Sequence, residues 1–143
     1  MFSSILLVCD GNICRSPTAE FILQNALPAK CVESAGLVGL TGQDMAPKAR
    51  DTAEQSGVHC PMHSAKKITE QICREFDLII VMEKRQKDEL IRRFPFVGGK
   101  TYLIRHWLDG ADVPDPWQRD DEVYQHAFKL IDEGAQSWVA KLR

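Results

Sequence analysis

Cys9 and Arg15 are separated by five residues near the start of the chain, and this spacing has a chemical meaning. A loop of that length can close around one phosphate-sized anion, with its backbone N–H groups and the positive end of a following helix directed at the anion. The same surroundings favour the thiolate form of a cysteine and make it a nucleophile. We therefore predict that this loop transfers a phosphoryl group onto the sulfur of Cys9.

The residues between and after this pair suit the same reaction. Arg15 offers a planar pair of donors that matches two phosphoryl oxygens, and backbone N–H groups of the loop supply the others. We expect Gly11 to relieve a tight turn and Asn12 to adopt a left-handed conformation. Ser16 can donate its hydroxyl to the sulfur. A Cys-x5-Arg spacing occurs by chance in many proteins, so the prediction depends on these neighbours.

The reaction also needs an acid to protonate the leaving oxygen. A loop at 109–116 with two prolines follows the last expected strand, and Asp115 is its best placed carboxylate. Asp112 and Asp109 are the alternatives. An Asp-Pro pair on its own would indicate only a turn.

The elements that flank the cysteine loop can be predicted from local patterns. The apolar run at 4–9 predicts a buried strand that ends at the cysteine. Residues 17–27 predict a helix with Ser16 as its N-cap, Pro17 as its first helical residue and Glu20 near a capping-box position.

Strands and helices alternate along the rest of the chain. We expect further strands at 31–35, 76–82 and 102–104, a loop at 36–47, and helices at 47–57, 69–74, 83–94 and 120–142. This alternation predicts an α/β fold, one three-layer domain with a parallel sheet and helices on both faces. Ligands of such folds bind beyond the carboxyl ends of the strands, which brings the loop at 109–116 to the cysteine loop.

Composition limits the remaining choices. The 143 residues include 44% hydrophobic and 27% charged residues and carry a net charge of −2, with a pI of about 6.1. These values suit one globular domain and give no support to nucleic-acid binding. No apolar stretch approaches the about 20 residues of a membrane span, and the N-terminus lacks a secretory signal. We expect a cytoplasmic protein without membrane insertion, and a monomer.

The five cysteines are scattered, which argues against a disulfide framework, and no pair has the two-residue gap typical of zinc ligands. We expect neither a metal nor another cofactor. Cys31 and Cys73 lie in apolar patterns and are expected to be buried thiols.

Residues 8–20 resemble the signature of the low-molecular-weight protein tyrosine phosphatases. Residues 113–117, Val-Pro-Asp-Pro-Trp, resemble the Asp-Pro-aromatic acid loop of that family. Residues 32–36 and 76–83 match further stretches in the right order, so we interpret 1–143 as one such phosphatase domain. The resemblance is strongest to the bacterial branch associated with capsule and exopolysaccharide tyrosine kinases.

The resemblance implies a four-stranded parallel sheet and hydrolysis of protein phosphotyrosine in two steps without a metal. Cys9 would attack phosphorus while Asp115 protonates the tyrosine oxygen, and Arg15 would hold the phosphoryl group throughout. Water would then hydrolyse the cysteinyl-phosphate, with the aspartate acting as base. The implied partner is a phosphotyrosine-containing protein, a tyrosine autokinase of polysaccharide export.

The resemblance also implies roles for residues around the loop. The phosphate-binding residues would be Asp10, Gly11, Asn12, Ile13 and Cys14. Ser34 and His63 would join Ser16 and Asn12 in a hydrogen-bond network, although His63 could instead be an ordinary surface histidine. Cys14 either packs under the loop or forms a protective disulfide with the nucleophile. Leu40 and Trp117 would form the cleft walls, and the alternative for both is ordinary packing.

Asp10 departs from the family pattern, in which the residue after the nucleophile is usually uncharged. A carboxylate beside a thiolate and a dianionic substrate should oppose both charges. If its side chain points to solvent, screening keeps the effect small. We therefore expect a modest penalty for phosphate binding.

Two other functions compete with the phosphatase. An arsenate reductase of related fold would share the Cys-x5-Arg loop but needs two further cysteines close together, whereas Cys60 and Cys73 are thirteen residues apart. A non-catalytic phosphotyrosine-binding module could dispense with the acid, which this chain retains.

Overall fold

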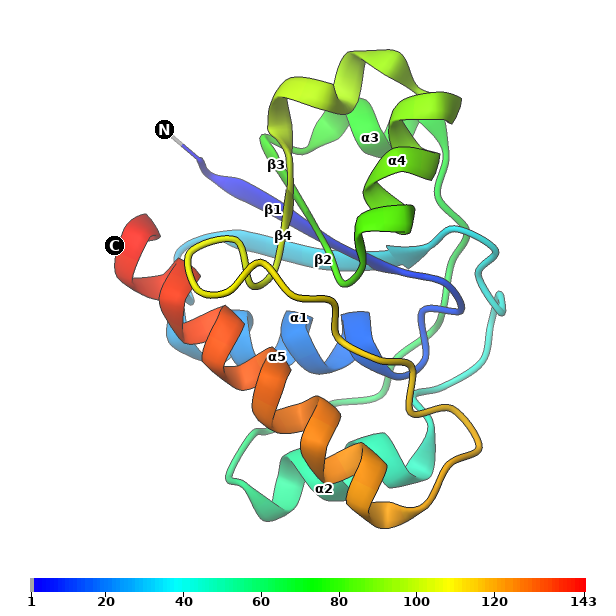
Figure 1. The fold of residues 1–143 in the computed structure, drawn as a ribbon, viewed down its shortest axis with the longest axis vertical. Coiled ribbons are helices and arrows are strands. Elements are labelled where there is room, and N and C mark those ends of the chain that lie inside the picture. Colours follow the sequence, from blue (N-terminus) through cyan, green and yellow to red (C-terminus); the bar gives the residue numbers. More distant parts are fainter. Residues whose placement is uncertain (1) are drawn as a thin grey trace.

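The computed structural model describes residues 2–143 and contains a four-stranded sheet (Figure 1). Its strands are β1 (Ser4–Cys9), β2 (Cys31–Gly36), β3 (Leu78–Val81) and β4 (Thr101–Leu103). They are ordered β2-β1-β3-β4, and each neighbouring pair is parallel. β1 therefore lies inside the sheet and delivers Cys9 to its carboxyl edge.

Helices lie on both sides of the sheet (Figure 1). On one side are α1 (Arg15–Ala26), α2 (Pro47–Gln55) and α5 (Asp121–Leu142), which contact one another. On the other side are α3 (Glu70–Glu75), α4 (Lys84–Arg93) and the 3-10 helix η1 (Pro95–Lys100). This arrangement confirms the predicted three-layer α/β domain. None of the helices within residues 2–143 is both long enough and apolar enough to cross a membrane.

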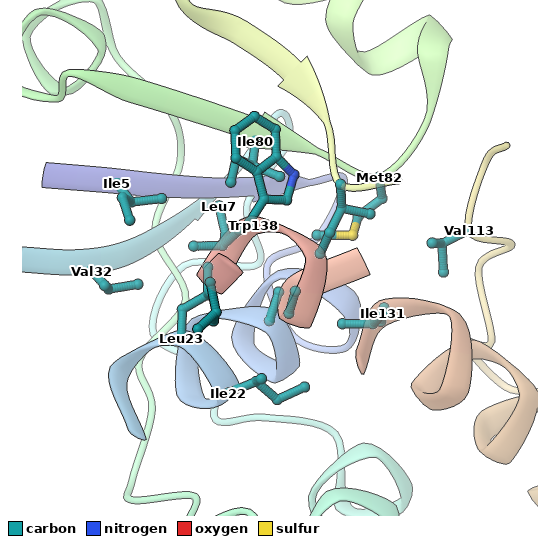
Figure 2. Close-up of a cluster of buried hydrophobic side chains, with 14 of the residues drawn as sticks. Ile5, Leu7, Ile22, Leu23, Val32, Ile80, Met82, Val113, Ile131 and Trp138 are labelled. Carbon is teal, nitrogen blue, oxygen red and sulfur yellow. The ribbon is translucent and has the colours of Figure 1, made fainter. Parts of the chain in front are cut away.

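The central strands are buried on both faces because helices cover both sides of the sheet, and successive side chains point to opposite sides. Ile5 and Leu7 pack with residues of α1 and α5, among them Trp138, as Figure 2 shows. Leu6 and Val8 point the other way and join the cluster under α3 and α4. β3 is likewise buried at every position, as its continuous apolar run predicts.

The helix after the cysteine loop begins earlier than predicted. α1 starts at Arg15 with Cys14 as its N-cap and no side-chain cap, so the prediction of Ser16 as N-cap is wrong. The hydroxyl of Ser16 instead contacts Cys9, and Glu20 binds a hydroxyl on β2 rather than closing a capping box. Buried tertiary contacts at the loop thus replace the local caps.

The other predicted elements lie within two residues of their observed ends. Asp120 precedes α5 and caps it, since its side chain accepts a hydrogen bond from the N–H of Val123 at 3.2 Å. The sequence does not predict η1, because the Pro and Gly residues of this segment are typical of a loop.

The two expected buried thiols differ. Cys73 belongs to α3 and is fully buried, as predicted. Cys31 is exposed, so that prediction is wrong: it opens the edge strand β2 and lies outside the buried clusters. All five cysteines are free thiols.

Candidate active site

The loop from Asp10 to Cys14 turns its carbonyl oxygens outward. Each carbonyl from Cys9 to Cys14 accepts a hydrogen bond from outside the loop, at 2.7 to 3.4 Å. The donors are the backbone N–H groups of Leu37, Val38, Gly39, Leu40, Ala46 and Thr18, the hydroxyl of Thr18 and the ring of His63. Because a trans peptide points its N–H and C=O in opposite directions, the N–H groups of the loop face inward.

These inward N–H groups form an anion site. Within residues 2–143, no group accepts a hydrogen bond from the backbone N–H groups of 10–14. Unpaired N–H groups in a buried loop are costly, and an anion at the centre satisfies several of them together. The N-terminus of α1 adds its positive dipole at the same point. The loop can therefore hold a tetrahedral oxyanion beside Cys9.

Two close approaches shape the loop. Asn12 has a φ of 63°, the left-handed conformation expected of it, whereas Gly11 does not lie in that region. A Cβ on Gly11 would meet Leu40 Cδ1 at 3.4 Å, so the glycine backbone lies against a side chain that lines the cavity. At the end of β2, a Cβ on Gly36 would lie 2.5 Å from the carbonyl oxygen of Asp10. Glycine at this position lets the two loops hydrogen-bond to each other.

A chain of hydrogen bonds runs from the sulfur of Cys9 into the protein. Ser16 Oγ lies 3.0 Å from Cys9 Sγ, and Asn12 Nδ2 donates to Ser16 Oγ at 2.8 Å. Asn12 Nδ2 also donates to Ser34 Oγ at 2.8 Å, and Ser34 in turn bonds to Glu20. Because an amide nitrogen only donates, Ser16 keeps its own proton for the sulfur. The network can thus stabilise negative charge on Cys9.

His63 is half-buried and holds the loop from outside. Its Nε2 lies 2.7 Å from the carbonyl oxygen of Asn12, and its backbone N–H donates to Asp44 Oδ1 at 3.0 Å. Burial lowers the pKa of His63, although the bond to Asn12 opposes the shift. A neutral ring that donates from Nε2 fits this carbonyl acceptor.

Arg15 opens α1 with only 2% of its surface exposed. Its Nη1 donates to Glu83 Oε2 at 2.5 Å and to the backbone oxygen of Val113 at 2.8 Å. Burial alone would lower the pKa of Arg15, but the negative charge of Cys9 and the hydrogen bond to Glu83 raise it. A charged guanidinium is therefore fixed along one edge, with its Nη2 directed to the loop.

The side chain of Asp10 does not point freely to solvent, so the condition for strong screening of its charge is not met. Its Oδ2 lies 3.2 Å from Arg15 Nη2, and Arg85 bonds to both of its carboxylate oxygens. Burial opposes ionisation, yet the hydrogen bond and charge of Arg85 bring the pKa of Asp10 below its ordinary value. The side chain is drawn to these arginines because β1 and β3 are neighbours and end side by side.

The acid loop reaches the same edge of the sheet. The N–H of Val113 donates to the backbone oxygen of Met82 at 2.9 Å, which fastens the loop beyond β3. Two residues later, Asp115 Oδ2 lies 3.8 Å from Arg15 Nη2, and Oδ1 accepts from the N–H of Trp117 at 3.0 Å. The carboxylate is 46% exposed and can therefore exchange protons with a ligand or water.

The other two aspartates of this loop are engaged elsewhere. Asp112 Oδ1 accepts from the N–H of Lys84 at 2.9 Å and so binds the first turn of α4. Asp109 forms a paired contact with Arg105 at 2.8 and 2.9 Å. Neither lines the cavity over Cys9, so of the three aspartates in this loop only Asp115 faces a ligand held there.

An open cavity of about 180 Å³ lies between the two loops. It is lined by Cys9, Asp10, Gly11, Ile13, Cys14, Arg15, Val38, Leu40, Asp115 and Trp117. Asn12 is absent from its wall because its side chain points into the hydrogen-bond network. The apolar side chains of Leu40 and Trp117 can flank a planar group attached to the anion. Val38 is a wall residue that the sequence interpretation missed.

Cys14 lines the cavity and also packs under the loop. Its sulfur lies 3.9 Å from the hydroxyl oxygen of Tyr124 on α5. Burial raises the pKa of Cys14 to about 12. At neutral pH it is a protonated thiol and does not compete with Cys9 as a nucleophile.

The sequence interpretation also missed Glu83 and Arg85. Glu83 lies directly before α4 and caps it, while its carboxylate reaches Arg15. A buried arginine requires a carboxylate partner, and this requirement could have directed attention to Glu83, the last residue of the matching stretch 76–83. Arg85 belongs to a run of charges that resembles an ordinary solvent-facing helix.

Within residues 2–143, no group of three or more His, Cys, Asp and Glu side chains is placed to hold a metal ion. The described residues bring together a thiol, inward N–H groups, a buried guanidinium and an exposed carboxylate, which is an arrangement suited to phosphoryl transfer.

Known proteins share both the sequence and the shape of this chain. Residues 4–143 match the family described as low molecular weight phosphotyrosine protein phosphatase. The low molecular weight protein-tyrosine-phosphatase Wzb of Escherichia coli K12 is 40% identical over 142 residues, which cover 99% of this chain and 97% of Wzb. The tyrosine phosphatase Wzb from Escherichia coli K30, in complex with sulphate, superposes with a TM-score of 0.97 at 38% identity and 100% coverage of both chains. Vibrio vulnificus Wzb in complex with benzylphosphonate gives 0.96 at 41% identity and 99% coverage of both chains.

Proposed function

Because the chain belongs to the low molecular weight phosphotyrosine protein phosphatase family, we propose that its cavity holds a phosphotyrosine side chain with the phosphoryl group beside Cys9. The protein is a protein-tyrosine phosphatase that acts through a cysteinyl-phosphate intermediate. The assignment of roles to residues rests on one observation, which is the convergence of inward N–H groups, Arg15 and Asp115 around one thiol. The sulphate and benzylphosphonate bound by the two Wzb proteins are a tetrahedral dianion and an aryl-bearing phosphonate, and both suit this proposal.

In the first step, Cys9 Sγ attacks phosphorus and forms an S–P bond. The P–O bond to the tyrosine breaks, and Asp115 gives its proton to the leaving oxygen. Arg15 and the loop N–H groups bind the three equatorial oxygens, where negative charge is spread in the transition state. Ser16 stabilises the thiolate before attack.

In the second step, water attacks the phosphorus of the cysteinyl-phosphate. Asp115, now a carboxylate, takes a proton from this water, and the S–P bond breaks to release phosphate and restore Cys9. The exposure of this carboxylate, at 46%, gives water access to it once the tyrosine has left.

We propose a tyrosine autokinase of polysaccharide export as the phosphotyrosine-containing partner. The support is the resemblance of residues 8–20 and 113–117 to the bacterial branch associated with such kinases.

We also propose that the enzyme acts as a monomer, because both loops of the cavity come from one chain.

The arrangement of cysteines favours the phosphatase over an arsenate reductase. Cys60 belongs to the cluster beside α2, whereas Cys73 lies in the cluster under α3, on the other side of the sheet. Neither lines the cavity, so neither is placed to relay a disulfide to Cys9. A binding module would not need Asp115 at the cavity wall.

The proposal is tested by hydrolysis of p-nitrophenyl phosphate and of a phosphotyrosine peptide. Cys9→Ser should abolish both activities, whereas the matched control Cys31→Ser, which changes an exposed thiol away from the cavity, should keep the parent rate. Turnover that survives in Cys9→Ser contradicts the assigned nucleophile. Thioredoxin-coupled reduction of arsenate by the parent chain would favour the reductase instead.

The substrate proposal needs a separate test. Immobilised Cys9→Ser should retain a tyrosine-phosphorylated autokinase from cell lysate, and inorganic phosphate should release it. Retention of a different phosphoprotein would show that the proposed partner is wrong while leaving the phosphatase activity intact.

A further inference from the structure

Four side chains of alternating charge meet beside the cavity: Asp10, Arg15, Glu83 and Arg85. Glu83 Oε2 lies 2.5 Å from Arg15 Nη1 and 3.0 Å from Arg85 Nη2. Asp10 Oδ2 lies 3.2 Å from Arg15 Nη2 and 2.5 Å from Arg85 Nη2. Each carboxylate therefore bridges the two arginines, and the four groups form a closed ring of ion pairs.

The position of Asp10 creates a conflict within this ring. Arg15 Nη2 is the edge of the guanidinium that faces the loop, and the phosphoryl oxygens need it. Asp10 Oδ2 already contacts this nitrogen, so the carboxylate competes with an incoming dianion. Only 29% of the Asp10 side chain is exposed, so solvent screens this charge incompletely.

Arg85 is placed to resolve the conflict. Its Nη1 lies 3.1 Å from Asp10 Oδ1 while its Nη2 contacts Oδ2, so Arg85 holds both carboxylate oxygens in a paired, bidentate contact, whereas Arg15 contacts Oδ2 alone. The Nη2 of Arg85 also donates a hydrogen bond to Glu83 Oε2 at 3.0 Å, which helps to fix the Arg85 guanidinium. Asp10 can thus lose its contact with Arg15 and still remain ion-paired with Arg85.

We propose that Arg85 is a positioning residue that takes over the Asp10 carboxylate when a phosphoryl group binds Arg15. The proposal rests on the proposed function, in which the loop takes a phosphoryl anion. It predicts that phosphate affinity depends on Arg85 only through Asp10. A chain with an uncharged residue at position 10 would have no need for Arg85.

The alternative role for Arg85 is direct contact with the substrate. Arg85 does not line the cavity, and both of its terminal nitrogens are engaged by carboxylates. Its side chain is 58% exposed, since it approaches the ring from the solvent side. This geometry favours action through Asp10.

The test compares four chains, namely the parent, Arg85→Ala, Asp10→Asn and the double variant. The affinity for inorganic phosphate is measured by calorimetry, together with KM and kcat for p-nitrophenyl phosphate. Arg85→Ala should weaken phosphate binding and raise KM, each by roughly fivefold, which is the fold-change expected from losing a partly exposed ion pair. The kcat should change much less. In the Asp10→Asn background, the same change should have almost no effect. Arg92→Ala is the matched control, because it removes an exposed arginine of α4 that pairs with Glu89.

Each outcome decides whether Arg85 acts through Asp10. Equal losses from Arg85→Ala in both backgrounds would show direct contact with the ligand and overturn the proposal, as would an unchanged affinity in the single variant. If the parent itself neither bound phosphate nor hydrolysed the ester, the proposed function would fail with it. A parent that binds phosphate while Arg85→Ala shows no coupling to Asp10 overturns the role of Arg85 alone.

Discussion

The backbone oxygen of Val113 accepts a hydrogen bond from Arg15 Nη1 at 2.8 Å, so the acid loop helps to fix the anion-binding guanidinium. The N–H of the same residue donates to Met82 at the end of β3. Val113 is fully buried and therefore acts as a rigid anchor between sheet and loop. Asp115 lies two residues later, so this anchor also holds it at a defined position relative to Arg15.

Asp115→Asn should separate chemistry from binding. The amide cannot protonate the leaving oxygen, so kcat for p-nitrophenyl phosphate should fall roughly 100-fold or more. Phosphate affinity should persist or increase, because a negative charge 3.8 Å from Arg15 Nη2 is removed. Steady-state kinetics and phosphate calorimetry measure the two effects.

The matched control for this change is Asp112→Asn, which alters a second aspartate of the same loop. Asp112 binds the N–H of Lys84 and does not line the cavity, so its variant should retain most of the parent kcat. If Asp112→Asn lost as much turnover as Asp115→Asn, the acid would have to be assigned again.

Gly36→Ala should displace the cysteine loop. The added Cβ would lie 2.5 Å from the backbone oxygen of Asp10, and no flexible side chain can yield there. We expect a loss of about 1–3 kcal/mol in the free energy of unfolding, the usual cost of overpacking, and a lower kcat. Urea denaturation and steady-state kinetics check both. Gly98→Ala is the control, because a Cβ there meets nothing within 4 Å, and an equal loss in that variant would contradict the steric argument.

Local signals predicted much of the fold and the nucleophile's setting. The apolar runs at 4–9 and 76–82 predicted buried strands, and Asn12 was predicted to be left-handed between a strand and a helix. These inferences succeeded because each depends on neighbouring residues in the chain. The prediction of Ser16 as N-cap failed because it ignored the tertiary structure, in which the Ser16 hydroxyl contacts Cys9.

The ion-pair ring could not be predicted in this way. In the register of β1 and β3, Val8 is opposite Val81, so Asp10 and Glu83 each lie two residues beyond the paired position. That coincidence depends on the strand order β2-β1-β3-β4, which no local pattern specifies. Without it, Arg85 resembles any charged residue on a solvent-facing helix.

Glu20 should make stability depend on pH. Burial raises the pKa of Glu20 above its ordinary value of 4.5, although its hydrogen bond with Ser34 opposes the shift. The folded state then binds the proton more tightly than the unfolded state. The stabilisation from this group is complete below pH 4.5 and is lost as pH rises through the folded-state pKa.

Glu20→Gln replaces the titratable carboxyl group with an amide of nearly the same shape. The free energy of unfolding, measured by urea denaturation between pH 4.5 and pH 8, should fall less with rising pH in the variant than in the parent. Glu54→Gln, an exposed position on α2, should leave the parent profile unchanged. Parallel profiles for the parent and Glu20→Gln would contradict the buried-carboxyl interpretation.

Cys14 should protect the nucleophile from irreversible oxidation. Peroxide converts the Cys9 thiol to a sulfenic acid and water, and attack by Cys14 then forms a disulfide and releases a second water. Both cysteines line the same cavity, and burial, which raises the pKa of Cys14 to about 12, keeps that thiol itself in the less oxidisable form. When Cys14 attacks the sulfenic acid, its proton passes to the departing hydroxyl group, which leaves as water. After peroxide treatment and reduction with dithiothreitol, the parent and the control Cys31→Ser should regain most of their activity, whereas Cys14→Ser should regain roughly half as much or less. Full recovery of Cys14→Ser would show that Cys14 only packs against Tyr124.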